Sequence, residues 1–152
     1  MIRFAIPLSL FLLSSAAFPA DLPDPKLTPG VVRTTDLNVI CHQTTKQFRN
    51  TTESMKIQVY RAYGMDAPHK GYCAATPEGC EIDHLISLEL GGADSVANLW
   101  PQAYPIARQK DHLENELHKR VCSGQLTPIQ AQQMISKNWI EAYQQIFGAS
   151  PK

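Results

Sequence analysis

The chain lacks an excess of charge of either sign, because its 152 residues carry 14 Lys and Arg against 14 Asp and Glu. Arg3 is the basic residue of an N-terminal segment that reads as an export signal, and its removal leaves 13 basic residues against 14 acidic ones. Tight nonspecific binding of a polyanion depends on neutralising many phosphates. A basic field over the whole surface is therefore excluded, and any positive charge that meets an anionic polymer must be local.

The chain also lacks a Cys-x-x-Cys pair, which is the usual spacing of a structural zinc site. Four cysteines in an exported chain are most simply two disulfides, for which three connectivities exist. A turn-forming segment, 76–79, lies between Cys73 and Cys80 and can bring them together. We therefore pair Cys73 with Cys80 and, by elimination, Cys41 with Cys122; zinc held by these cysteines is the alternative.

Long apolar runs are scarce, and the one at 4–13 is too short to span a bilayer. A basic residue precedes it and small residues follow, which is typical of a signal peptide over 1–20, cleaved after Ala16, Ala17 or Ala20. No cysteine lies near this junction, which argues against a lipid-anchored mature N-terminus. The alternative to cleavage is that the segment remains as an uncleaved anchor. We expect an exported chain, periplasmic or secreted, without stable membrane insertion after cleavage.

About 130 residues remain after the signal, enough for one domain with one modest core. Three prolines mark 21–37 as an extended leader, and a single domain is expected over 38–148. Apolar periodicity and capping residues, such as Thr127 before Pro128, indicate the elements. They are a helix over Thr52–Tyr63, strands over Cys80–Leu85 and Val96–Trp100, a helix over Pro105–Val121, and a helix that starts at Pro128 and stops at Gly148.

The helix over Pro105–Val121 carries two stripes of side chains at helical spacing. One is apolar and should face the core: Ile106, Leu113, Leu117 and Val121. The other lies beside it and is mainly polar: Ala107, Asp111, Glu114 and His118.

The hairpin between the helices is the most informative stretch. Asp83 and His84 stand side by side near the end of the first strand, Gly91-Gly92 form the turn, and Asn98 lies at the second strand. Hydrolysis of a phosphodiester needs a nucleophilic water, a cation to stabilise charge on the phosphate, and help for the departing oxygen. A neighbouring carboxylate and imidazole can contribute to the first two of these requirements.

This order and spacing resembles the HNH endonucleases, whose ββα-metal core has an Asp-His pair on the first strand, Gly-Gly in the loop, Asn-Leu on the second strand, and a ligand-bearing helix. The resemblance covers residues 81–110, about a fifth of the chain. It implies an α+β fold, in which a ββα-metal hairpin and helix are flanked by an N-terminal and a C-terminal helix and stabilised by disulfides.

The resemblance implies a role for each of three residues. His84 is expected to be the general base, since an imidazole titrates at about pH 6.5 and can accept a proton at neutral pH. Asp83 is expected to hold a divalent ion, magnesium or else manganese, because these hard cations prefer carboxylate and water oxygens. Asn98 is expected to brace the backbone around His84 by hydrogen bonding.

The helix departs from the family pattern at the metal site. The family's third histidine or asparagine falls nine positions after the asparagine, where this chain has Ala107, although Lys110 matches the lysine often found three residues later. Asp111, Glu114 and His118 share the Ala107 stripe and are candidates for the missing ligand, with Asp111, one turn away, the best placed. Otherwise the metal keeps extra waters.

Phosphate contacts are expected from Arg108 and Lys110, with a solubilising surface as the alternative for each. Such contacts position a strand and do not read its sequence. No helix-turn-helix, zinc finger or long basic arm is present in the sequence, which predicts low sequence specificity.

The sequence therefore predicts an exported, monomeric, metal-dependent endonuclease that acts on DNA in preference to RNA. One alternative is a non-catalytic binding module that kept the scaffold and lost the metal site, and Ala107 favours it. A cell-wall glycosidase using Glu81 and Asp83 is disfavoured, because its two carboxyl groups must lie about 5 to 9.5 Å apart across a cleft.

Overall fold

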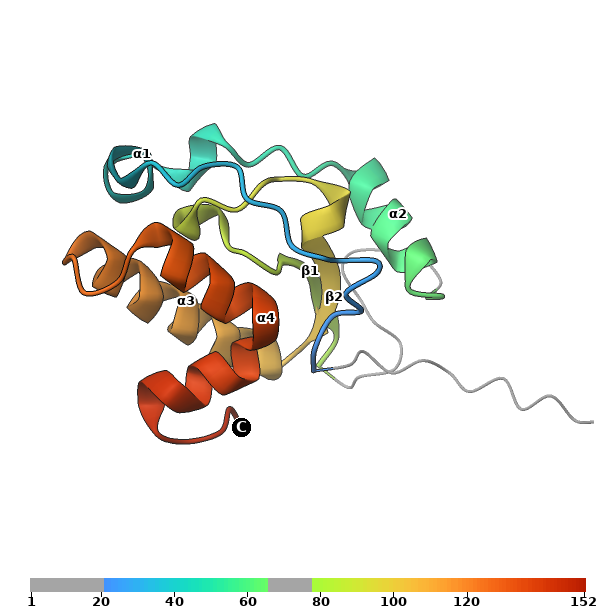
Figure 1. The fold of residues 1–152 in the computed structure, drawn as a ribbon. Coiled ribbons are helices and arrows are strands. Elements are labelled where there is room, and N and C mark those ends of the chain that lie inside the picture. Colours follow the sequence, from blue (N-terminus) through green and yellow to red (C-terminus); the bar gives the residue numbers. More distant parts are fainter. Residues whose placement is uncertain (1–20, 66–77) are drawn as a thin grey trace, which may run out of the picture.

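The computed structural model describes residues 21–65 and 78–152 (Figure 1). The predicted signal peptide and Cys73, and with it the predicted Cys73–Cys80 bridge, lie outside the described residues. The main elements are helices α1 (Leu37–His42) and α2 (Glu53–Ala62), strands β1 (Cys80–His84) and β2 (Leu99–Ala103), and helices α3 (Ile106–Cys122) and α4 (Pro128–Phe147). Short 3₁₀ helices cover Thr45–Gln47, Leu88–Leu90 and Val96–Asn98.

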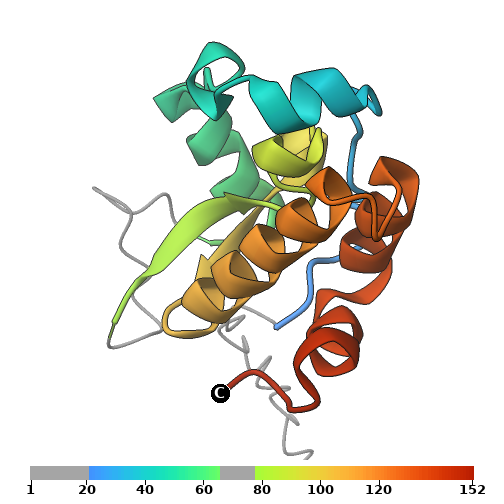
Figure 2. The same cartoon turned by 90° about the vertical axis from the view of Figure 1, so that its left-hand side faces the viewer.

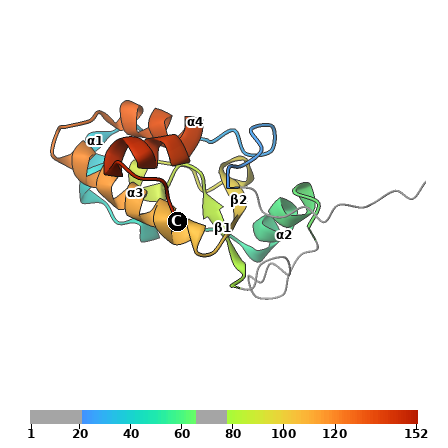
Figure 3. The same cartoon turned by 90° about the horizontal axis from the view of Figure 1, so that it is seen from below.

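β1 and β2 form an antiparallel hairpin that lies between two groups of helices. α2 packs on β2 from one side, while α3 packs against both strands from the other and carries α4 on its outer face (Figures 1 and 3). Figure 2 shows α3 running along the hairpin with α4 beside it. The α+β class predicted from the sequence is confirmed, with a two-stranded sheet in the part of the chain that is described.

The register of the hairpin decides which side chains share a face. Asp83 lies opposite Trp100 and Glu81 opposite Gln102, so these four side chains belong to one face of the ribbon. His84 lies opposite Leu99 and belongs to the other face. Two residues that are adjacent in the sequence thus point to opposite sides of the hairpin.

The bounds of the hairpin differ from those expected. β1 ends at His84 rather than Leu85, and β2 starts at Leu99 and continues through Pro101 to Ala103 rather than covering Val96–Trp100. In a two-stranded sheet each strand has a free edge, so a proline can be accommodated without breaking the ladder. The helices α2 and α3 lie within one residue of their predicted ranges, whereas α1 and the 3₁₀ helices were not expected.

Both glycines of the turn are required by the geometry. Gly91 has φ +83°, and a Cβ on Gly92 would lie 1.9 Å from the Ile86 carbonyl oxygen. The leader crosses at this place, because the amides of Arg33 and Thr34 donate to the Gly91 carbonyl at 2.8 and 3.1 Å. The Thr28 hydroxyl likewise donates to the Leu99 carbonyl at 2.8 Å. The leader is therefore packed along the hairpin.

The main core lies between α1, α3 and α4. The predicted apolar stripe of α3 is buried at Leu113, Leu117 and Val121, and Ile106 packs against the same cluster. The predicted disulfide between Cys41 and Cys122 is present and joins the end of α1 to the end of α3. No helix among the described residues has the length and apolarity to cross a membrane.

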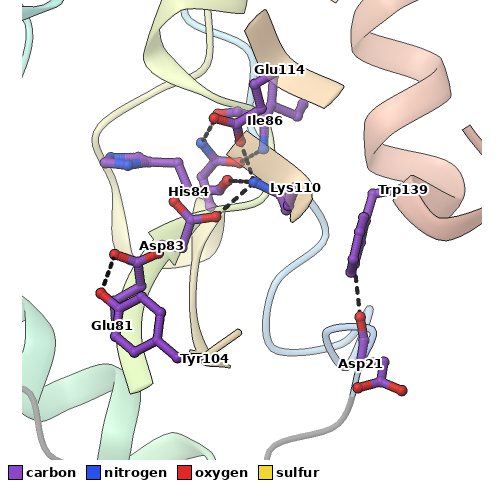
Figure 4. Close-up of polar contacts among 10 residues, drawn as sticks. Asp21, Glu81, Asp83, His84, Ile86, Tyr104, Lys110, Glu114 and Trp139 are labelled. Atoms are coloured by element: carbon purple, nitrogen blue, oxygen red, sulfur yellow. Dashed lines mark hydrogen bonds and ion pairs between the residues drawn. The ribbon is translucent and has the colours of Figure 1, made fainter. Parts of the chain in front are cut away.

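α4 starts at the predicted cap, where the Thr127 hydroxyl accepts from the Gln130 amide in a capping box. Its interior contains a break that the sequence pattern did not indicate, because Asn138 has φ −164° and ψ 97°. The Asn138 side chain accepts from the amide of Ile140 at 3.1 Å and so caps a second helical segment. Trp139, just after the break, donates to the Asp21 carbonyl at 2.7 Å and holds the start of the leader (Figure 4).

Candidate active site

The Asn98 side chain organises the loop that follows β1. It is completely buried, and its amide nitrogen donates to the carbonyls of Ile86 and Ala93, both at 2.9 Å. Its oxygen accepts from the amides of Ile86 at 3.0 Å and Val31 at 3.3 Å. The four backbone groups that Asn98 binds lie outside the helices and strands, so regular secondary structure provides no hydrogen-bond partner for them. Asn98 therefore closes the loop and fixes the backbone after His84.

His84 faces the α2 side of the hairpin and is paired with a carboxylate. Its Nε2 lies 2.9 Å from Oδ1 of Asp94, and the residue is 3 % exposed. Asp94 also accepts from the Thr51 hydroxyl at 2.6 Å and from the Asn50 amide. These hydrogen bonds, with that from His84, outweigh burial and hold the pKa of Asp94 below its ordinary value.

The protonation of His84 follows from these surroundings. Burial lowers its pKa from the ordinary value, although Asp94 and Asp83 act in the opposite direction. The imidazole is therefore neutral at pH 7. An ionised carboxylate can only accept a hydrogen bond, so Nε2 carries the proton and donates to Asp94. The lone pair is left on Nδ1, which is the nitrogen that can take up a proton.

Asp83 faces the α3 side and binds a buried ammonium (Figure 4). The Nζ of Lys110 donates to Oδ2 of Asp83 at 2.6 Å, to the carbonyl of His84 at 2.7 Å, and to the carboxylate of Glu114. Lys110 is fully buried and all three of its N–H bonds have acceptors. The structure thus contradicts the prediction that Lys110 contacts a phosphate, because its charge is used inside the protein.

Two carboxylates share this one ammonium, and the charges are not balanced. Burial opposes a charged lysine, but Asp83 and Glu114 together outweigh it and raise the pKa of Lys110. Burial and the charge of Asp83 raise the pKa of Glu114 to about 8, even with Lys110 in contact. At neutral pH the cluster therefore relieves its excess negative charge by protonating Glu114, while Asp83 and Lys110 remain an ion pair.

Further carboxylates surround Asp83 on the α3 side. Burial raises the pKa of Asp111, and the negative charge of Asp83 adds to the shift. Burial likewise raises the pKa of Glu81, although the Tyr104 hydroxyl donates to this carboxylate at 2.8 Å. Such clusters of like charge attract cations. The charge of Asp83 thus acts on Asp111, the other residue predicted as a metal ligand.

The other candidates for the missing ligand are not brought to this place. Glu114 is engaged by Lys110, and His118 lies near the far end of α3, where its Nε2 is 3.0 Å from the Ile40 carbonyl. Ala107 is buried and contributes only a methyl group. Arg108 is exposed on α3, 3.8 Å from Glu78, and is the one of the two predicted phosphate contacts that remains accessible.

The residues present fit a hydrated hard cation better than a closed protein cage. Among the described residues, the only three-ligand group with suitable spacing is Cys41, His118 and Cys122, far from Asp83. One carboxylate oxygen of Asp83 accepts a hydrogen bond from Lys110, and the other oxygen remains available to a cation. Gln102, on the Asp83 face, is fully buried, and its side-chain amide has no hydrogen-bond partner in the described part of the chain. Magnesium tolerates one or two carboxylates completed by water.

No family model, no curated protein and no solved structure matches this chain. The geometry alone therefore has to carry the functional argument.

Sequence reasoning missed one residue of the site, Asp94, and gave another, Lys110, a different role. Asp94 lies just beyond the Gly91-Gly92 turn, and nothing in its local sequence marks it as the partner of His84. Lys110 left a clearer signal, since it lies on the apolar stripe, four residues after Ile106 and three before Leu113. A lysine at a core-facing position must find buried counter-charges.

Proposed function

We propose that this chain is an exported, metal-dependent endonuclease of the HNH type that hydrolyses phosphodiester bonds of DNA, and secondarily RNA, with low sequence specificity. One observation carries the proposal. A neutral imidazole held by an ionised carboxylate, His84 on Asp94, is adjacent along β1 to Asp83, on the opposite face of the hairpin, whose carboxylate has one oxygen that Lys110 does not bind. These are the groups that general-base hydrolysis of a phosphodiester requires.

His84 acts through Nδ1. It accepts a proton from the water whose oxygen attacks phosphorus, and the imidazolium formed is stabilised by Asp94, which already holds Nε2–H at 2.9 Å. Because the pKa of Asp94 is lowered by its own hydrogen bonds, it stays ionised and keeps this tautomer in place. Asn98 fixes the backbone from which His84 and Ile86 extend.

Asp83 and Asp111 would hold the divalent cation, with water completing its shell. Bound there, magnesium supplies positive charge to the phosphate oxygens and to the departing oxygen. Lys110 orients the Asp83 carboxylate by binding one of its oxygens. Arg108, exposed on the same helix, contacts the strand through its phosphates.

Export is supported by the N-terminal sequence and by the Cys41–Cys122 disulfide, since disulfides persist in oxidising compartments. Separation from the chromosome would protect the producing cell. A version that lacks residues 1–20 is expected to damage cellular DNA, and the same version carrying His84→Ala is expected to be harmless.

The test is cleavage of supercoiled plasmid by the oxidised mature protein in magnesium, manganese or chelator. Nicking is expected with either metal and not with chelator, and His84→Ala is expected to lower it by roughly 100- to 10,000-fold. His42→Ala, an exposed histidine at the end of α1, is the matched control and should cleave normally. Chelator-resistant cleavage, or equal cleavage by His84→Ala, would contradict the proposal.

A non-catalytic binding module is the second candidate, and two observations favour it. His84 is only 3 % exposed, and Lys110 already neutralises Asp83. On this account the polar cluster is structural and the protein binds nucleic acid without cutting it. A folded sample that shifts DNA in a gel but leaves DNA and RNA intact in every metal would decide for it.

A further inference from the structure

The disulfide between α1 and α3 has a histidine, His118, beside it. His118 lies one turn before Cys122 on α3, so the two side chains share a face. The Nε2 of His118 lies 3.6 Å from Sγ of Cys122, and the ligand atoms of Cys41, His118 and Cys122 all lie within 4.8 Å of one another. None of these atoms takes part in the Asp83 and His84 site.

The separation between His118 and Cys122 matches that between two ligands of one metal ion. With Zn–S of about 2.3 Å and Zn–N of about 2.0 to 2.1 Å, a tetrahedral site sets sulfur and nitrogen roughly 3.6 Å apart. Cys122 and His118 already have this spacing. Metals bind the thiolate, however, and a disulfide offers none. The group can bind a metal only after reduction.

We propose that the reduced protein binds a thiophilic divalent cation of the zinc class through Cys41, Cys122 and His118, and that oxidation to the disulfide expels it. A dithiol or phosphine reductant supplies two electrons that break the S–S bond, and two protons complete the thiols. Metal binding then releases those two protons as the thiolates coordinate. α1 and α3 are cross-linked in both states, by sulfur in one and by the metal in the other.

His118 must change its tautomer to serve as a ligand, because the ring nitrogen that binds the metal has to give up its proton. In the oxidised protein its Nε2 lies 3.0 Å from the Ile40 carbonyl, which can only accept, so Nε2 carries the proton. Coordination through Nε2 moves the proton to Nδ1 and releases this hydrogen bond. Cys122 is exposed, so a reductant and a metal can both reach the group from solvent.

A water oxygen would complete a tetrahedral shell around the metal, because no carboxylate among the described residues joins the three ligand atoms within 4.8 Å. A two-sulfur, one-nitrogen, one-oxygen set is an acceptable tetrahedral zinc environment.

The test titrates cobalt(II), a spectroscopic substitute for zinc, into the mature protein reduced with a phosphine. Thiolate-to-cobalt absorption is expected to saturate at one equivalent and to disappear when zinc is added. The oxidised protein should show no such absorption. Cys122→Ser should abolish it, and His118→Ala should weaken binding at least tenfold, whereas His42→Ala, a neighbouring exposed histidine, should bind normally.

The reduced chain also has thiols at its other cysteines. Cys122→Ser distinguishes metal binding at those thiols from metal binding at the proposed site. If reduction unfolds the metal-free chain, zinc should restore its helical circular dichroism, and His118→Ala should need at least tenfold more zinc. Binding that survives Cys122→Ser or ignores His118→Ala would overturn the proposal, as would a reduced protein that takes up no cobalt or a reduced chain that zinc does not refold. None of these results depends on nuclease activity.

Discussion

Asp83 and His84 are neighbours on β1 and have opposite surroundings. His84 lies on the α2 side with one carboxylate, and burial keeps its ring neutral. Asp83 lies on the α3 side with an ammonium, two further carboxylates and a buried amide. The strand separates the proposed proton acceptor from the proposed cation site although the two residues are consecutive. Adjacency in a strand sequence therefore indicates shared position along the strand, not shared contacts.

The surroundings of both Asp83 and His84 depend on the loop that Asn98 closes, and removal of the Asn98 side chain should have the largest effect. Asn98→Ala leaves the Ile86, Ala93 and Val31 backbone groups without their partner, and each buried unsatisfied group costs about 1 to 3 kcal/mol. We expect the free energy of unfolding to fall by about 4 kcal/mol or more in urea titrations. The exposed Asn115→Ala is the control and should change it by less than about 0.5 kcal/mol.

The Asp83 side can be broken at its buried cation. Lys110→Met removes the ammonium and leaves Asp83 and Glu114 facing each other, which should destabilise the fold by about 3 to 5 kcal/mol. Glu114 is already protonated at neutral pH, so adding Glu114→Gln should change this loss little there and should recover part of it only at alkaline pH, where Glu114 would otherwise become charged. Lys119→Met, an exposed lysine on α3, is the control. A Lys110→Met protein as stable as the parent in thermal melts would contradict the assignment.

The His84 side can be weakened without removing the base. Asp94→Asn keeps the size of the side chain but withdraws the charge that orients the ring, and hydrogen bonds to charged groups are worth about 1.5 to 3 kcal/mol. We expect kcat to fall roughly 10- to 100-fold. The acid limb of the pH–rate profile should move to lower pH, because Asp94 raises the pKa of His84. A purely structural Asp94 would leave that limb where it is.

The smallest expected effects are changes in folding stability with pH, which have opposite signs for His84 and Glu114. The folded-state pKa of His84 lies below 6.5, so the unfolded chain binds more protons, and His84 makes the fold less stable as pH falls below about 6.5. The pKa of Glu114 is raised from 4.5 to about 8, so its contribution to stability is lost as pH rises through this range. Stability profiles of His84→Ala and Glu114→Gln, each subtracted from the parent, should have slopes of opposite sign.

Much of the fold follows from local sequence signals. The capping box at Thr127, the stripe of α3 and the turn between Gly91 and Gly92 each depend on neighbouring residues, and the structure has all three. The Cys41–Cys122 pair was reached by elimination and is also present. The cap, the stripe and the turn can be predicted from the sequence because their physical causes lie within one helical turn, one helix or one hairpin.

What sequence could not supply depends on contacts between distant segments. β2 extends through Pro101 because, in the described part of the chain, β1 is the one strand beside it, and α4 breaks at Asn138, where Trp139 turns toward Asp21. The partner of His84 is Asp94, which is itself held by residues 43 and 44 positions away. The site residues Asp83, His84 and Asn98 therefore remain predictions from the sequence, and the sequence did not indicate their electrostatic contacts.

The most direct test of the separate roles of Asp83 and His84 is single-turnover cleavage of DNA as a function of magnesium concentration. The account predicts that Asp83→Asn shifts the magnesium midpoint upward by at least tenfold, whereas His84→Ala lowers the plateau rate and leaves the midpoint unchanged. Parallel shifts in both variants, or a parent rate that does not depend on magnesium, would contradict it.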